Sequence, residues 1–108
     1  MNKTIFICDD NCAIVDMLEM ALTEFTDATI ITETDSRNVV PCLLDAQPEI
    51  FLVDISMPML SGDQLIKEIK RNLVLNSMFI VCMSANPRRE EIAIAAGADV
   101  FLVKPFDT

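Results

Sequence analysis

Short apolar runs alternate along this chain with longer segments whose apolar residues recur at helical spacing. Five runs are rich in β-branched or aromatic residues and predict strands over residues 4–8, 28–34, 49–54, 78–84 and 99–103. Apolar residues in these runs are mostly continuous rather than alternating with polar ones. This pattern is typical of strands buried on both faces of a parallel sheet.

The clearest helical pattern covers residues 13–25. Its apolar residues recur at i, i+3 and i+4 and form one face, made by Ile14, Met17, Leu18, Ala21, Leu22 and Phe25. Three acidic residues lie largely off this face: Asp16, Glu19 and Glu24. We therefore expect an amphipathic helix packed against the sheet.

Boundary residues predict the next two helices. Pro41 is tolerated only in a first turn, so the second helix should begin near Asn38 and end at Ala46. Ser61, with Gln64 three residues later, has the spacing of a capping box and should open the third helix.

Asn86 as an N-cap, followed by Pro87, should begin a fourth helix that ends at Gly97. Strands and helices thus alternate through the whole chain, which implies a parallel sheet covered by helices on both faces, with right-handed crossovers. There is no repeat, linker or low-complexity tract, so residues 1–108 are expected to form one α/β domain.

Composition narrows the range of functions. The formal net charge of −9 disfavours nucleic acid or an anionic membrane as a direct ligand, whereas it suits a cation or a basic protein partner. No apolar run approaches the roughly 20 residues of a membrane helix, and the N-terminal segment does not resemble a signal peptide. Four cysteines without a CxxC pair indicate a reduced, cytoplasmic protein, and the lack of histidine excludes a histidine base or metal ligand.

Polar residues end four of the five predicted strands or come directly after them: Asp9 and Asp10, Asp54, Ser84, and Lys104. Each has a simpler interpretation when taken alone, as a turn former, a helix cap or a solvated charge. Ligands of open parallel sheets, however, bind outside the carboxyl ends of the strands. The shared placement of these residues therefore favours one site at that edge.

Four segments in this order resemble those of the response-regulator receiver domain of two-component signalling. They are "DD" at 9–10, "DISMPMLSG" at 54–62, "SA" at 84–85 and "KPF" at 104–106. The resemblance covers the chain from its first strand to its fifth. It implies a flavodoxin-like, doubly wound, five-stranded parallel sheet of strand order 2-1-3-4-5, and a fifth helix that would follow "KPFDT" and is not in this sequence.

The resemblance also assigns roles to residues. Asp54 would be the phosphoacceptor, taking a phosphoryl group from the phosphohistidine of a histidine kinase or phosphotransfer protein. Lys104 would keep Asp54 ionised and then pair with the phosphoryl oxygens, to which Ser84 would donate its hydroxyl. Phe101 stands at the family's switch position, where it lacks the hydroxyl of the common tyrosine.

A divalent cation is the implied cofactor, Mg²⁺ or Mn²⁺, because a carboxylate that attacks a phosphate needs its charge neutralised. Asp10 and Asp54 would bind it directly with the Ser56 carbonyl, and Asp9 through a water molecule. The cation would relieve the repulsion between the neighbouring carboxylates.

Further expectations concern the end of the chain and the lifetime of the phosphoryl group. The bond before Pro105 is expected to be cis, and Phe106 to be exposed, which favours pairing with another chain as a homodimer. Ser56 and Asn86 occupy the positions on which phosphoryl lifetime depends in the family. Ala85 is small and would leave room for the phosphoryl group.

Two alternatives stay open. A phosphatase of the haloacid-dehalogenase type also forms an aspartyl-phosphate, but it needs D-x-D after the first strand, where this chain has Asp10-Asn11-Cys12. The second alternative is a receiver-like interaction module that no longer accepts phosphate.

Overall fold

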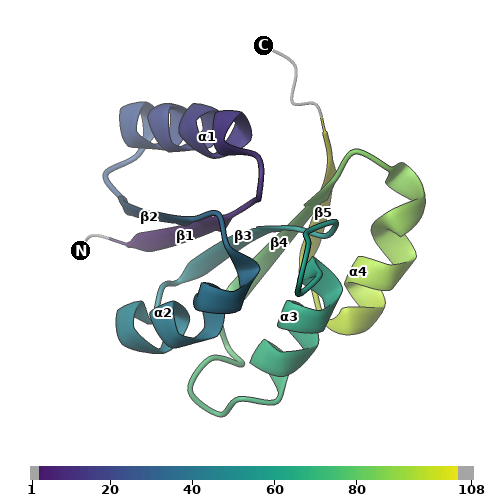
Figure 1. Cartoon of the computed structure of the whole chain (residues 1–108). Coiled ribbons are helices and arrows are strands. Elements are labelled where there is room, and N and C mark those ends of the chain that lie inside the picture. Colours follow the sequence, from purple (N-terminus) through teal and green to yellow (C-terminus); the bar gives the residue numbers. More distant parts are fainter. Residues whose placement is uncertain (1–2, 105–108) are drawn as a thin grey trace.

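The strands form one parallel sheet in the order β2-β1-β3-β4-β5, as expected (Figure 1). The computed structural model describes residues 3–104. The strands are β1 (Thr4–Cys8), β2 (Thr29–Glu33), β3 (Ile50–Asp54), β4 (Phe79–Ser84) and β5 (Val100–Val103). The helices between them are α1 (Cys12–Phe25), α2 (Val39–Ala46), α3 (Gly62–Lys70) and α4 (Glu90–Ala96). The expected doubly wound α/β fold is confirmed.

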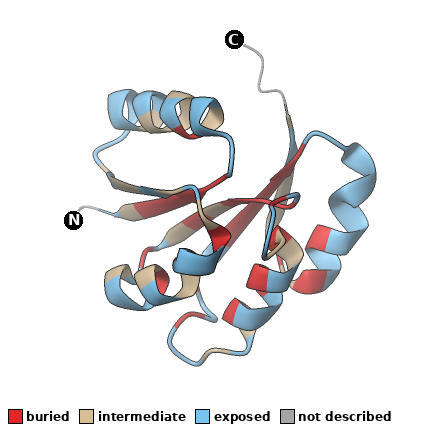
Figure 2. Cartoon of the chain, viewed as in Figure 1, coloured by how far each residue is buried: buried red, intermediate tan, exposed pale blue. Residues whose placement is uncertain are grey.

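The two faces of the sheet are covered unequally. Helix α1 lies on one face, and α2, α3 and α4 lie on the other (Figure 1). The larger core lies under these three helices, where Phe6 and Phe51 are fully buried and their rings meet edge to face at 5.9 Å. The smaller core joins Ile5 and Ile7 of β1 to Val15 of α1. Figure 2 shows buried residues along the central strands and on the helix sides that face them.

Alternate residues of each strand point to these two cores, and parallel pairing keeps the strands in register. Cys8 pairs with Val53 of β3, and Val53 pairs with Cys82 of β4. The carboxyl ends of β1, β3 and β4 therefore lie level with one another. Whatever follows these strands is brought to one edge of the sheet.

The helix boundaries follow from local hydrogen bonds. The Asn11 side chain accepts from the backbone N–H groups of Ala13 and Ile14 and begins α1. At α3, the Gln64 side chain accepts from the backbone N–H and the hydroxyl of Ser61, so the predicted capping pair is formed.

A 3₁₀ turn precedes α2 and α4: α2 begins at Val39, as expected, whereas α4 begins at Glu90, later than expected. The turn η1 (Ser36–Asn38) leads into α2, and η2 (Pro87–Arg89) leads into α4. The Asp35 side chain caps the first turn and the Asn86 side chain the second, so the cap at Asn86 was predicted but the type of turn was not. Short 3₁₀ turns are common at helix starts, where the hydrogen-bond pattern has not yet reached i+4.

No helix in residues 3–104 is long and apolar enough to cross a membrane. Pro105 and Phe106, with their expected cis bond and exposure, lie outside the described residues.

Candidate phosphoacceptor and cation site

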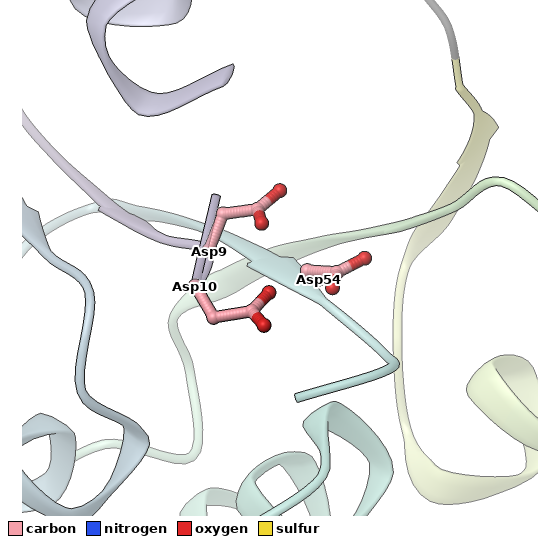
Figure 3. Close-up of side chains that lie close together, drawn as sticks. All are labelled: Asp9, Asp10 and Asp54. Carbon is pink, nitrogen blue, oxygen red and sulfur yellow. The ribbon is translucent and has the colours of Figure 1, made fainter. Parts of the chain in front are cut away.

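Three carboxylates meet at the carboxyl edge of the sheet. Asp9 and Asp10 follow β1, Asp54 ends β3, and the three side chains lie side by side (Figure 3). Each offers an oxygen that lies within 4.8 Å of the others. Asp9 and Asp54 are buried, whereas Asp10 is exposed. The sheet thus concentrates negative charge at a point that solvent reaches mainly from the side of Asp10.

Lys104, which follows β5, reaches across the sheet to this cluster. Its ammonium lies 2.7 Å from Asp9 Oδ2 and 3.2 Å from Asp54 Oδ1. The family resemblance pairs Lys104 with Asp54, and this ion pair is present, but the contact of Lys104 with Asp9 is shorter. Asp9 is fully buried, so the counter-charge offsets part of the cost of burying its ionised carboxylate.

Burial and neighbouring charges shift the pKa values of both Asp54 and Lys104. Burial raises the pKa of Asp54 above its ordinary value, and the Asp9 charge adds to this, while Lys104 acts in the opposite direction. Burial alone would lower the pKa of Lys104, but the hydrogen bond to Asp9 and the charges of both carboxylates raise it. The single ammonium therefore offsets only part of the charge on Asp54.

Ser84 is buried at the end of β4 and is tied to its neighbours through both its side chain and its backbone. Its hydroxyl oxygen accepts from the Asn86 N–H at 3.0 Å, and its carbonyl accepts from the Lys104 N–H at 2.7 Å. Among residues 3–104 the Ser84 hydroxyl donates to no protein acceptor. Phe101 of β5 is partly buried and packs against the larger core.

The segment between β3 and α3 borders the site. Ser56 is exposed, and Met57 is buried with its sulfur accepting from the Cys8 thiol at 3.6 Å. The Gly62 N–H donates to the Ile55 carbonyl at 2.9 Å, and this hydrogen bond joins the two ends of the segment. A Cβ at Gly62 would clash with the Asp54 carbonyl oxygen, so only glycine allows α3 to approach the end of β3 this closely.

Two residues near the site were missed by sequence reasoning. Asn11 begins α1 directly after the acidic pair, and its own N–H donates to Asp9 Oδ1 at 3.0 Å. An asparagine before an amphipathic segment could have signalled this cap. Ser36, which contacts the segment between β3 and α3, carries no such signal because its partners lie more than 20 residues away.

The family of the chain is shown by its match to a family model. The model of the response regulator receiver domain matches residues 5–108, which is nearly the whole chain. The chain belongs to this family. It is a receiver domain whose acidic pocket, formed by Asp9, Asp10 and Asp54, is typical of phosphoaccepting response regulators and of their Mg²⁺ sites.

Individual relatives agree with the family match. The chain is 35% identical to the chemotaxis protein CheY of Thermotoga maritima over 107 residues, covering 98% of this chain and 88% of that protein. It is 32% identical to the response regulator GtcR of Aneurinibacillus migulanus, covering 99% of this chain but only 43% of that protein. The chain therefore spans less than half of this longer relative.

Among solved structures, the receiver domain of a sensor histidine kinase from Pseudomonas aeruginosa has the same fold. Its TM-score is 0.88 at 22% identity, and the match covers 99% of this chain and 88% of that one. That structure holds a magnesium ion coordinated in its active-site cleft.

Family membership also bears on the phosphatase alternative. Receiver domains are signalling modules rather than conventional enzymes, and the phosphoacceptor candidate of this chain ends β3 instead of β1. Both observations disfavour the haloacid-dehalogenase alternative.

Proposed function

We propose that Asp54 is the phosphoacceptor in a phosphorelay. An Asp54 carboxylate oxygen attacks the phosphorus of a phosphohistidine, the P–N bond breaks, and the imidazole leaves with the electron pair and is then protonated. The observation that carries this assignment is the position of Asp54, which lies at the end of a central strand beside two further carboxylates and the Lys104 ammonium.

The donor set fits a hard divalent cation. Three carboxylates within 4.8 Å of one another supply oxygen ligands, and one ammonium leaves their charge incompletely offset. Asp10 and Asp54 would hold the ion with the Ser56 carbonyl, and Asp9 would contact it through water, since its oxygens already accept from Lys104 and Asn11. Bound Mg²⁺ or Mn²⁺ would neutralise the carboxylates and the phosphoryl oxygens during transfer.

Residues on β4 and β5 would then sense the phosphoryl group. Lys104 would exchange its contact with Asp54 for one with the phosphoryl oxygens, and Ser84 would donate its hydroxyl to them. Because the Ser84 carbonyl accepts from the Lys104 N–H, a movement of one strand end is passed to the other. Phe101, which is only partly buried, could then pack more deeply and alter the surface of β4 and β5.

Partners and location follow from the same proposal. A histidine kinase or a phosphotransfer protein would supply the phosphoryl group, in the cytoplasm. The net charge of −9 disfavours direct contact with nucleic acid by this domain. Self-association as a homodimer stays a prediction, which sedimentation equilibrium of the free and phosphorylated protein tests.

Phosphorylation with a small-molecule donor tests the assignment. The wild-type protein should gain one phosphoryl group from acetyl phosphate with Mg²⁺, seen by intact-mass spectrometry, and Asp54→Ala should gain none. Asp45→Ala is the matched control, because Asp45 is an exposed residue of α2 away from the site. Equal incorporation in Asp54→Ala would refute the assignment of the nucleophile.

Beryllofluoride provides an independent check, because it occupies a phosphoacceptor without a leaving group. It should bind the wild-type protein with Mg²⁺ and not bind Asp54→Ala. A wild-type protein that takes neither acetyl phosphate nor beryllofluoride would instead be the interaction module considered from the sequence.

A further inference from the structure

A buried serine joins the start of α2 to the loop beside the phosphoacceptor. Ser36 lies in η1 with 3% of its surface exposed. Its hydroxyl donates to the Pro58 carbonyl at 2.8 Å and accepts from the Leu60 N–H at 3.1 Å. One side chain thereby satisfies two backbone groups of a segment that is 22 to 24 residues away in the sequence.

The residue between these two backbone groups adopts an unfavourable conformation. Met59 has φ of +71°, and the Leu60 N–H also donates to the Pro58 carbonyl at 2.9 Å around it. This is the hydrogen bond and the φ value of a classic γ-turn, which is rare and strained for a residue other than glycine. Such a conformation persists only where the surroundings hold it.

The Met59 side chain does not supply that hold, since 70% of its surface is exposed. The base of the loop is fixed elsewhere, by the Gly62 N–H on the Ile55 carbonyl and by the contact of Met57 with Cys8. At the tip, the Ser36 hydroxyl forms hydrogen bonds to the residues on both sides of Met59.

We infer that Ser36 is a positioning residue for the divalent-cation site. It holds the strained turn at Met59 closed, and this fixes the path of the loop from Asp54 to Gly62, which carries the Ser56 carbonyl. The inference rests on the proposed function, because it assumes that the Ser56 carbonyl is a ligand. A group that orients a ligand in this way commonly changes metal affinity by an order of magnitude.

Mg²⁺ titration of Ser36→Ala, followed by calorimetry where the protein is fully folded, tests the inference. Affinity should fall by about tenfold, the lower end of the effect of such supporting groups. Ser77→Ala, an equal change at an exposed position between α3 and β4, should leave the affinity unchanged. Wild-type affinity in a folded Ser36→Ala protein would overturn the role of Ser36.

A double-mutant cycle separates positioning from a general loss of stability. Glycine adopts positive φ without strain, so Met59→Gly should keep the turn closed without help from Ser36. In this background Ser36→Ala should weaken Mg²⁺ binding by no more than about twofold, against about tenfold in the wild-type background. A loss of the same size in both backgrounds would overturn the coupling.

Amide exchange in the wild-type protein gives a readout that needs neither a variant nor a metal. The Leu60 N–H should be protected from exchange, because it bonds to the Ser36 hydroxyl and to the Pro58 carbonyl. Unprotected exchange would refute the role of Ser36 in holding the turn. Failure of the wild-type protein to bind Mg²⁺ would overturn the proposed cation site and this inference together. Mg²⁺ binding that Ser36→Ala leaves unchanged would overturn this inference alone.

Discussion

Carboxylates stand at both ends of the sheet, and they are used in opposite ways. At the amino end, Glu49 Oε1 accepts from the Thr4 N–H at 2.6 Å and Asp99 Oδ2 accepts from the Ile80 N–H at 2.8 Å. Both of these side chains are exposed, and each has a backbone donor of its own. At the carboxyl end, three carboxylates face one another instead and share one lysine.

This difference separates a structural use of charge from a functional one. A carboxylate that accepts from a backbone N–H near the start of a strand stabilises the fold, and no ligand is needed to complete its contacts. Three clustered carboxylates, two of them buried, weaken the fold unless a cation arrives. Substitutions at the amino end of the sheet should therefore change stability alone, whereas those at the carboxyl end should also change the response to Mg²⁺.

The largest effect is expected from Lys104→Met. The substitution leaves the fully buried Asp9 without its ion-pair partner, which should lower the free energy of unfolding by about 3 kcal/mol in the metal-free protein. Urea denaturation without Mg²⁺ measures this. A loss below about 1 kcal/mol, the value of an exposed ion pair, would contradict the importance of the pair.

Mg²⁺ should have the next largest effect. At 100 times its dissociation constant it should add about 2.7 kcal/mol to the stability of the wild-type protein, and a chelator should reverse this. Asp10→Ala should remove most of the stabilisation, since Asp10 is the exposed carboxylate of the cluster and a proposed direct ligand. Equal thermal shifts with Mg²⁺ in both proteins would rule out Asp10 as a ligand.

A smaller effect is expected at the amino end. Asp99→Ala removes the acceptor of the Ile80 N–H and should cost about 1 kcal/mol. The added stability from Mg²⁺ should be the same in this variant as in the wild-type protein. If Asp99→Ala also reduced the stabilisation by Mg²⁺, the carboxylates at the amino end would not be purely structural.

The smallest effect is a gain in stability with Asp54→Asn. The pKa of Asp54 is raised, chiefly by burial. The folded protein therefore holds the proton of the Asp54 carboxyl group more tightly than the unfolded chain does. The stability that Asp54 contributes is therefore present below its ordinary pKa and lost as pH rises through its folded-state pKa.

Asp54→Asn avoids this loss and should melt a few degrees higher than the metal-free wild-type protein at neutral pH. The difference should shrink as the pH falls toward the ordinary pKa of aspartate, and Mg²⁺ should reverse it. Thermal melts of both proteins across this pH range measure it. A difference that does not change with pH would show that ionisation of Asp54 is not its cause.

Much of the fold could be predicted because it depends on local pattern. The strand 4–8 was predicted with its observed bounds, and the other strands lie within one residue of their predicted ends. Capping by Ser61 and Asn86, and Pro41 in a first turn, were also local features. The two 3₁₀ turns were missed because the same capping residues can precede either kind of helix.

The sequence by itself determined which residues could form the site. Each candidate residue ends a strand or comes just after one, and a parallel sheet must bring strand ends of one direction to one edge. These residues are Asp9, Asp10, Asp54, Ser84 and Lys104. Motif spacing then indicated a receiver domain, and the family match confirms it.

Only the tertiary structure decided which carboxylate Lys104 contacts most closely and which remote residue supports the loop beside the site. Lys104 lies closer to the buried Asp9 than to the buried Asp54, although the family resemblance pairs it with Asp54. Contact with Ser36, which begins η1, closes the turn at Met59 from more than 20 residues away. Both outcomes depend on burial and on distances between segments remote in the chain, and no local pattern of side chains specifies these quantities.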